Sequence, residues 1–206
     1  MNGKFISIEG IEGAGKSTQL AFIERYLKQH GKQLVVTREP GGTELGEQIR
    51  TLLLTPTTTS MAVDTELMLM FAARAEHVAQ VIKPALANGN WVLSDRFTDA
   101  TFAYQGGGRG IDQQRIKSIA DWTLNGLQPD LTLLFDVPVE VGQQRVQSRN
   151  QGVDRFEQEK VDFFQRIRDC YLERAQQEPE RIKIIDASQS ITEIEAQLTL
   201  ILKPLL

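Results

Sequence analysis

Residues 10 to 17 of the chain read Gly10-Ile11-Glu12-Gly13-Ala14-Gly15-Lys16-Ser17, and this stretch decides the fold. It matches G-x-x-x-x-G-K-[ST], the P-loop pattern of nucleoside triphosphate sites. A strand-like apolar run precedes it at 5–8, and apolar residues follow it at a helical spacing. In such a loop the backbone N–H groups surround phosphate oxygens, the Lys carries a charge near the β and γ phosphates, and the Ser hydroxyl binds Mg²⁺. The sequence therefore predicts a site for a nucleoside triphosphate with Mg²⁺.

Composition narrows the class of protein. The 206 residues are 41% hydrophobic and 24% charged, which is ordinary for one globular domain spanning 1–206. A net charge of −4 argues against general binding to nucleic acid or to an anionic membrane, because both need a basic face. The sequence holds no apolar run of ~18 residues and no signal-peptide profile, so we expect a cytoplasmic protein. Cys170 is the only cysteine, which excludes an internal disulfide.

Five short apolar runs alternate with helical patterns along the chain. The runs are 5–8, 34–37, 91–94, 131–135 and 182–185. This alternation predicts an α/β fold: a three-layer α/β/α P-loop NTPase with a five-stranded parallel sheet flanked by helices. In such sheets ligands bind beyond the carboxyl ends of the strands. The residues directly after each run are therefore the candidates for a site.

Charged residues follow the second and third runs. Arg38 and Glu39 precede a Pro-Gly-Gly corner, and Arg50 comes one helical stretch later. After the third run, Asp95 can hold Mg²⁺, and Arg96 can grip a second phosphate with its forked guanidinium. The plain alternatives are a turn with surface charges and an ordinary Asp-Arg ion pair. Both groups nevertheless occupy positions where this fold places its ligands.

Two further segments carry candidate residues. The helical pattern from Asp64 onward is mostly an apolar stripe, and Arg74 is the exception in it, since a buried Arg needs a partner. A bound base or phosphate would supply one. The segment 104–110 reads Tyr-Gln-Gly-Gly-Gly-Arg-Gly, which is typical of a ligand-contacting loop or of a flexible surface loop.

The segment at about 145–157 contains three arginines around a polar turn: Arg145, Arg149 and Arg155. Such a cluster is unfavourable unless an anion visits it, and a solvated basic face is the alternative. We expect this segment to be a short lid that closes arginines over transferring phosphates.

Together these motifs resemble the thymidylate kinase family, in its bacterial form, over nearly the whole chain. The resemblance rests on the stretches 8–18, 38–43, 71–77, 95–97, 104–108 and 154–157. It implies transfer of the γ-phosphate of ATP to dTMP, giving dTDP and ADP, in dTTP biosynthesis for DNA synthesis. It also implies Mg²⁺ as the cofactor, ATP and dTMP as the small-molecule partners, and a homodimer.

The resemblance also assigns residues to each ligand. Contacts with ATP are implied for Gly10, Ile11, Glu12, Gly13, Ala14, Gly15, Lys16, Ser17, Thr18 and Arg145. Contacts with dTMP are implied for Glu12, Arg38, Arg50, Met70, Phe71, Arg74, Arg96, Thr101, Tyr104 and Gln105. The implied metal ligands are Ser17 and Asp95, and the implied catalytic residues are Lys16, Asp95, Arg96, Arg149 and Arg155.

Four of the implied dTMP contacts have a specific role in the family. Arg96 would clamp the dTMP phosphate, and Arg74 would hydrogen-bond the edge of thymine. Tyr104 would crowd the sugar 2′ position and so disfavour ribonucleotides, while Glu12 would lie near the sugar 3′-hydroxyl.

The chain departs from the family at one position. The family stacks thymine on a Phe four residues before the base-reading Arg, where this chain has Met70, followed by Phe71. A one-residue step turns a side chain by about 100° around a helix, so both cannot face the base in the same way. Either Met70 packs on thymine through its sulfur or Phe71 does, and we favour Phe71.

Other activities stay open from the sequence alone. A kinase of nucleosides would share this core, but a nucleoside has no phosphate for Arg96 to hold. A slow GTP-hydrolysing switch would need an Asn-Lys-x-Asp element for guanine, which the sequence lacks. Because the P-loop carries no Arg, the resemblance gives the transition-state role to Arg149 or Arg155. We expect no general base, since the dTMP phosphate is already ionised near neutral pH.

Overall fold

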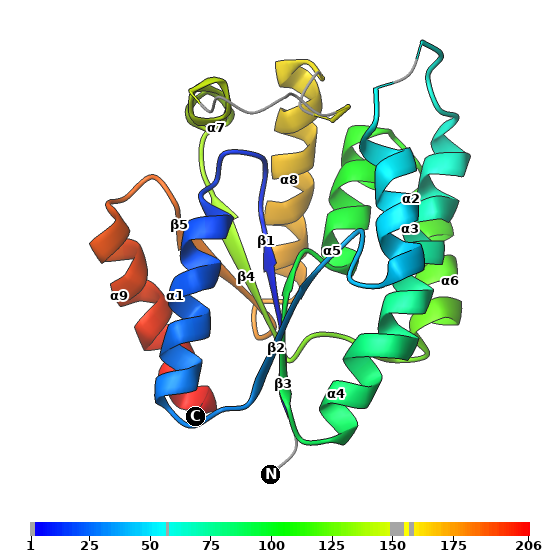
Figure 1. Ribbon diagram of the computed structural model, residues 1–206. Helices are drawn as coiled ribbons and strands as arrows, with labels where there is room; N and C mark the ends of the chain where they lie inside the picture. The colour runs from blue at the N-terminus through cyan, green and yellow to red at the C-terminus, as the bar shows by residue number, and fades with distance from the viewer. Residues whose placement is uncertain (1–2, 57, 149–154, 157–158) are drawn as a thin grey trace.

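A computed structural model describes residues 3–56, 58–148, 155–156 and 159–206 (Figure 1). Five strands form one parallel sheet in the order β2-β3-β1-β4-β5. They are β1 (Phe5–Glu9), β2 (Leu34–Arg38), β3 (Trp91–Asp95), β4 (Leu131–Asp136) and β5 (Ile182–Asp186). The predicted α/β fold with a five-stranded parallel sheet is confirmed.

Each strand runs one residue further than its apolar pattern. The additional residue is charged in all five strands: Glu9, Arg38, Asp95, Asp136 and Asp186. The predicted run ends at the preceding residue, whereas backbone pairing does not depend on the side chain and continues. The carboxyl edge of the sheet is therefore a row of charged side chains.

Helices cover both faces of the sheet (Figure 1). One face carries α1 (Lys16–Gln29) and α9 (Ile191–Leu202), which continues into a 3₁₀ turn (Lys203–Leu205). The other face carries α2 (Glu44–Leu54), α3 (Val63–His77), α4 (Lys83–Ala87), α5 (Thr98–Thr101), α6 (Gln113–Leu124) and α8 (Val161–Gln177). Two π-helical segments, Val78–Ile82 and Phe102–Gly108, follow α3 and α5, and α7 (Val139–Gln147) lies above the carboxyl end of the sheet.

Local sequence signals begin two of these helices. The Thr43 side chain accepts the N–H of Gly46 and caps α2. At α9, Ser190 and Glu193 form a capping box, in which each side chain binds the other's backbone N–H. A cap of this kind stabilises a helix by about 1 kcal/mol.

The main core lies between the sheet and the helices on both faces. Its fully buried members include Ile6, Ile23, Leu133, Ile167 and Leu198. Burying a side chain of this size stabilises the fold by about 1.5–3 kcal/mol. Of the described helices, none has the length and apolarity needed to cross a membrane.

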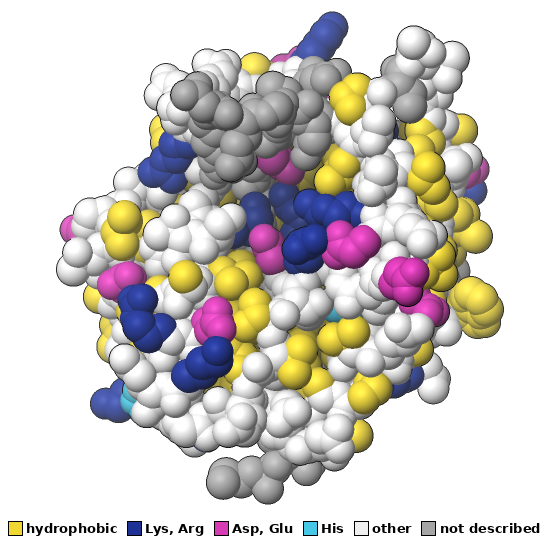
Figure 2. Space-filling view, viewed as in Figure 1, with side chains coloured by type: hydrophobic (Ala, Val, Ile, Leu, Met, Phe, Trp, Pro, Cys, Tyr) yellow, Lys and Arg dark blue, Asp and Glu magenta, His cyan; other side chains and the backbone are white. Residues whose placement is uncertain are grey.

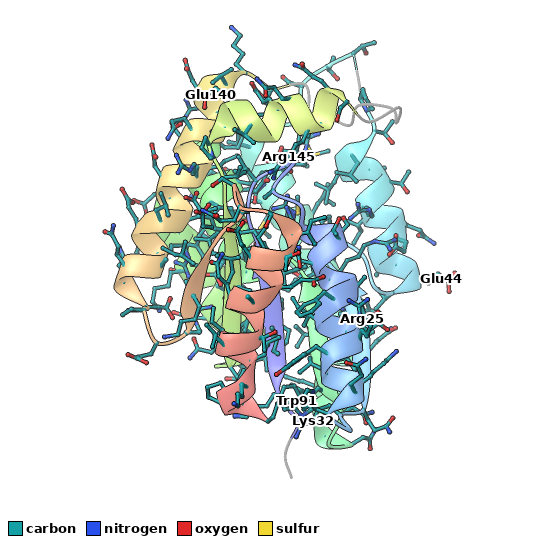
Figure 3. All side chains as sticks on the ribbon, turned by 90° about the vertical axis from the view of Figure 1, so that its left-hand side faces the viewer. Arg25, Lys32, Glu44, Trp91, Glu140 and Arg145 are labelled. Atoms are coloured by element: carbon teal, nitrogen blue, oxygen red, sulfur yellow. The ribbon has the colours of Figure 1, made fainter. Side chains whose placement is uncertain are left out.

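The polar end of the sheet is the end near α7. In Figure 3, Arg145 on α7 lies at one end of the molecule, and Trp91 at the start of β3 lies at the other, beside Lys32. Figure 2 shows Lys, Arg, Asp and Glu side chains gathered in a hollow of the surface. The fold thus brings the charged strand ends and the P-loop to one place.

Candidate active site

Close backbone packing holds the P-loop. Gly13 has a φ of 75°, and a Cβ on it would lie 2.1 Å from the carbonyl oxygen of Gly142 in α7. A Cβ on Gly142 would lie 2.7 Å from the carbonyl oxygen of Glu12. The backbone of α7 therefore packs directly on the P-loop, and only glycine permits this approach at both positions.

The Lys16 side chain folds back over the P-loop. Its Nζ donates hydrogen bonds to the carbonyl oxygens of Gly10 (2.8 Å) and Ile11 (2.9 Å). Burial lowers the pKa of Lys16 to about 8, and the nearby charge of Arg96 acts in the same direction. An anion beside the amine would favour its charged form. The loop is thus prepared for a phosphate, which the N-terminus of α1 also attracts.

The two predicted metal ligands lie on one pocket. Ser17, exposed in the first turn of α1, and Asp95, at the end of β3, both line an open pocket of about 440 Å³. Oδ1 of Asp95 is buried and has no hydrogen-bond partner among the described residues. Arg38 lines the same pocket and forms an ion pair of 2.8 Å with Glu47.

A second pocket of about 160 Å³ lies between the P-loop and α3. Most of the residues predicted to bind dTMP line it: Glu12, Arg50, Met70, Arg74, Arg96, Thr101, Tyr104 and Gln105. Glu39, Pro40, Leu54, Phe97, Ala100 and Phe156 complete the lining. Arg38 and Phe71, which the resemblance also implied, do not line it. We call this the acceptor pocket.

Arg96 joins the acceptor pocket to the P-loop. Its Nη1 donates to the carbonyl oxygen of Gly10 (3.1 Å), and its Nη2 donates to Oε1 of Glu12 (2.8 Å) and to the hydroxyl of Tyr104 (2.9 Å). Nη1 also lies 3.3 Å from the hydroxyl of Tyr171. The guanidinium is therefore fixed before any ligand binds.

Arg74 lies in the wall of the acceptor pocket and is only 2% exposed. Its Nε donates to Oε2 of Glu39 (2.7 Å), and its Nη2 donates to the carbonyl oxygen of Phe97 (3.0 Å). Its third nitrogen, Nη1, is buried without a partner among the described residues. A buried unpaired donor costs about 1–3 kcal/mol, so this atom favours a ligand that brings an acceptor.

Of the two residues proposed to pack on a base, Met70 lines the acceptor pocket and Phe71 does not. Met70 lines the acceptor pocket, whereas Phe71 is 3% exposed and packs in a core cluster with Leu67 and Phe97. The Phe71 ring also lies 4.9 Å from the guanidinium carbon of Arg74. The expectation that Phe71 faces the base is corrected, because the helix docks with that face toward the core.

Tyr104 occupies the inner side of the acceptor pocket. Its hydroxyl lies 2.7 Å from both carboxylate oxygens of Glu12, and burial together with that carboxylate raises the pKa of Tyr104 well above its usual value. Thr101 and Gln105 are buried nearby, and Gln105 donates to Glu66 (2.8 Å). The pocket wall is thus rigid on this side.

The predicted lid arginines differ in their positions. Nη1 of Arg145 donates to the carbonyl oxygens of Gly13 (3.4 Å) and Ala187 (3.1 Å), so it lies beside the P-loop. Arg155 is not brought there: it forms an ion pair of 2.7 Å with the buried Glu66 and contacts the backbone of α2. Arg149 lies outside the described residues.

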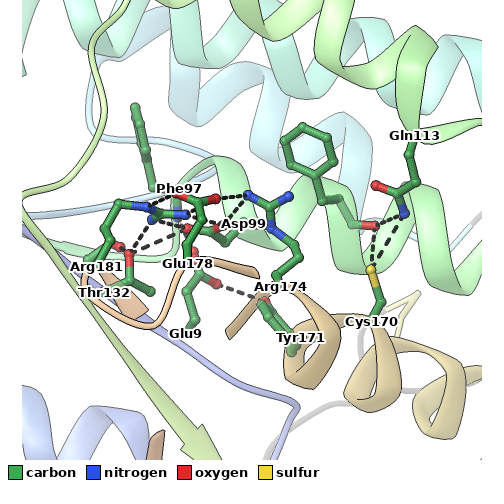
Figure 4. A network of polar contacts seen from close by, with 12 residues as sticks. Glu9, Phe97, Asp99, Gln113, Thr132, Cys170, Tyr171, Arg174, Glu178 and Arg181 are labelled. Atoms are coloured by element: carbon green, nitrogen blue, oxygen red, sulfur yellow. Dashed lines mark hydrogen bonds and ion pairs between the residues drawn. The ribbon is translucent and has the colours of Figure 1, made fainter. Parts of the chain in front are cut away.

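Several residues of this region were not predicted as site residues. Glu9 is fully buried at the end of β1, and burial together with the nearby charge of Asp99 raises its pKa to about 7. Tyr171 reaches Glu9 from α8, and Arg174 and Arg181 hold Asp99 at 2.6 Å and 2.7 Å (Figure 4). A Glu inside an apolar strand, directly before the P-loop, is the signal that points to this group.

Comparisons with known proteins agree on one family. The family model described as thymidylate kinase matches residues 8–198. Proteins named thymidylate kinase from Chromobacterium violaceum and Vesicomyosocius okutanii are 54% and 57% identical to the chain. The alignments cover 99% and 98% of this chain and 95% and 98% of those proteins. The crystal structure of thymidylate kinase from Ehrlichia chaffeensis matches with a TM-score of 0.78 at 32% identity, over 98% of this chain and 99% of that one.

Proposed function

The chain belongs to the thymidylate kinase family and is a dTMP kinase, and we propose the roles that its residues take in moving the γ-phosphate of ATP to dTMP. One observation carries the proposal. The acceptor pocket is lined by the P-loop residue Glu12, by the fixed guanidinium of Arg96 and by Arg74, whose Nη1 has no partner in the described part of the chain. A monophosphate beside Arg96 would meet a triphosphate held by the P-loop.

On the acceptor side, we assign the dTMP phosphate to Arg96, with Arg50 nearby in the same pocket. The unpaired Nη1 of Arg74 would donate to a carbonyl oxygen of thymine, and Met70 would pack on the base. Tyr104 fills the space beside Glu12 and would exclude a 2′-hydroxyl. These contacts select a deoxyribonucleotide with a carbonyl on the facing edge of its base.

On the donor side, the P-loop amides and Lys16 would hold the ATP phosphates, with Thr18 and Arg145 close by. Among the described residues, no group of three or more His, Cys, Asp and Glu could hold a resident metal ion. Ser17 and Asp95 fit a Mg²⁺ that arrives with ATP, because the Ser17 hydroxyl shares the pocket with Oδ1 of Asp95, which has no partner among the residues that the structure describes. The ion would neutralise charge on the phosphates.

Phosphoryl transfer requires the protein to position the two substrates and requires little covalent chemistry from its side chains. Donor and acceptor oxygens must be in line, the charge on the transferring group must be neutralised, and water must be kept out. Arg96 and Lys16 both donate to the carbonyl oxygen of Gly10, so two cations lie beside the place where the reacting phosphates would meet. We retain one domain with a lid at about 145–157, in which Arg149 or Arg155 would supply a transition-state charge, and Arg155 must leave Glu66 to do so.

We also propose that the protein is a homodimer and that it is cytoplasmic. Three large apolar side chains are exposed on adjacent helices: Leu52 of α2 (58%), Met68 of α3 (57%) and Trp122 of α6 (84%). Their exposure on neighbouring helices favours a partner surface on this side of the molecule. Sedimentation of the wild type as a dimer and of the Trp122→Glu variant as a monomer would support this. A monomeric wild type would refute it.

An assay of ADP release tests the acceptor assignment. The chain is incubated with Mg-ATP and, in turn, with dTMP, dUMP, dCMP, dGMP or thymidine. We expect dTMP to be used best, because Arg96 needs a phosphate and Arg74 needs a base carbonyl. Turnover of thymidine in preference to dTMP would remove Arg96 from the proposed role.

A further inference from the structure

We propose that Glu9 is a positioning residue for Arg96: its carboxylate holds the backbone next to residue 96 and, through Tyr171, the guanidinium at the other end of the side chain. The inference rests on the proposed function, in which Arg96 binds the acceptor phosphate. It adds a residue of the P-loop strand and a residue of α8 to the machinery that aims this guanidinium.

Arg96 needs to be held because its backbone is strained. Its φ is 70°, in the left-handed region that side chains other than Gly, Asn and Asp rarely adopt. Within the described chain, only Asn125 shares this property among non-glycine residues. A strained residue persists only where its surroundings fix it. The conformation turns the side chain back from the end of β3 to the carbonyl oxygen of Gly10.

The first contact of Glu9 fixes this backbone. Oε1 of Glu9 accepts the N–H of Phe97, the residue directly after Arg96, at 2.8 Å. Phe97 itself is fully buried, so water cannot replace the lost acceptor. This hydrogen bond therefore fixes the direction of the backbone directly after Arg96.

The second contact fixes the guanidinium. The Tyr171 hydroxyl donates to Oε2 of Glu9 at 2.7 Å, and Nη1 of Arg96 donates to the same hydroxyl at 3.3 Å. Figure 4 shows the Tyr171 side chain pointing from α8 toward Glu9. A carboxylate thus orients the hydroxyl, so that its oxygen is free to accept from Arg96.

A carboxylate suits this task better than an amide would. Glu9 is fully buried and lies near Asp99, whose charge is balanced by Arg174 and Arg181. Burying a carboxyl group here costs free energy unless its oxygens accept hydrogen bonds. Two acceptor oxygens serve two donors that come from different elements, whereas the amide of a glutamine offers one acceptor only.

Steady-state kinetics of the full chain tests the inference. For Glu9→Gln, we expect the KM for dTMP to rise about tenfold or more and the KM for ATP to stay within about twofold. Tyr171→Phe removes the hydroxyl between Glu9 and the guanidinium but keeps the hydrogen bond from Phe97 to Glu9. For this variant we expect a smaller rise of about threefold in the KM for dTMP.

Asp136→Asn is a matched control. Asp136 ends the neighbouring strand β4 and is also bound from α8, by Arg168 at 2.6 Å and 2.8 Å, but it does not contact Arg96 among the interactions described. We expect its KM for dTMP to equal that of the wild type. A rise equal to that of Glu9→Gln would show that any lost contact to α8 has this effect and would overturn the inference.

A double variant separates this inference from the proposed function. If Arg96→Ala fails to raise the KM for dTMP selectively, the proposed role of Arg96 fails. If it succeeds, adding Glu9→Gln should change that KM by no more than about twofold, because Glu9 acts through Arg96. Independent, multiplying effects would overturn the inference alone. If Glu9→Gln does not fold, the same test with Tyr171→Phe decides in the same way.

Discussion

The acceptor pocket and the P-loop differ in which parts of the chain hold their cations. In the acceptor pocket, Arg96 makes four hydrogen bonds and Arg74 makes two, before any ligand is bound. On the donor side, Lys16 rests on carbonyl oxygens of its own loop, and Oδ1 of Asp95 has no partner among the described residues. The acceptor-side cations are held from several elements, which leave Nη1 of Arg74 without a partner among the described residues, while the donor-side cation is held by its own loop.

The largest expected effect comes from removing the donor-side cation. Lys16→Ala should lower kcat by about 10³-fold, because Lys16 is the one basic residue of the stretch 10–17. The affinity for dTMP, measured by equilibrium titration without ATP, should stay within about twofold. An equal loss of dTMP affinity would show that the two halves are not built separately.

Removing the acceptor-side cation should have a smaller and selective effect. Arg96→Ala should raise the KM for dTMP by about 10- to 100-fold, the size of one or two charge-assisted hydrogen bonds. The KM for ATP should change by less than about threefold. Arg96→Lys serves as a control that keeps the charge and loses the fork. Equal changes in both KM values would contradict the division.

Substitutions of Met70 and Phe71 test which of the two residues belongs to the acceptor pocket and which to the core. Met70→Ala should raise the KM for dTMP by several-fold and lower the melting temperature less than Phe71→Ala does, since Met70 lines the pocket and is only partly buried against the core. Phe71→Ala should lower the free energy of unfolding by about 3–5 kcal/mol, because it empties a core position. The reverse pattern would restore Phe71 as the base-stacking residue.

The smallest effect concerns the pH dependence of stability. Glu9 has a pKa of about 7 in the fold against 4.5 as its ordinary value, so the folded chain binds the extra proton between these values. Its contribution to the free energy of unfolding is present below pH 4.5 and is lost as the pH rises through about 7. The loss is at most about 3 kcal/mol.

Chemical unfolding of the wild type and of Glu9→Gln at pH 5 and pH 8 measures this contribution. Relative to the variant, the wild type should lose stability on going to pH 8. Parallel changes in the two proteins would show that Glu9 titrates in the fold as it does in water.

The sequence predicts the sheet well because apolar runs and P-loop geometry are local properties. The apolar runs locate all five strands, but each run ends one residue before the strand does. The residue left out is charged, and it belongs to the strand because its backbone is paired. The arrangement of the site depends on contacts between residues far apart in the sequence. Whether Met70 or Phe71 faces the ligand depends on how α3 docks, and the ion pair of Arg155 with Glu66 joins residues far apart in the chain. Neither pattern nor spacing carries that information.

The close backbone contact between Gly13 and Gly142 joins two segments that are far apart in the sequence. Gly142 belongs to the helix that leads into the expected lid, yet its main chain touches the phosphate-binding loop without any side chain between them. A side chain at position 142 would displace the P-loop, as a side chain at position 13 would. Surveys of variants should therefore count position 142 among the nucleotide-binding positions, although it stands well over a hundred residues from the motif.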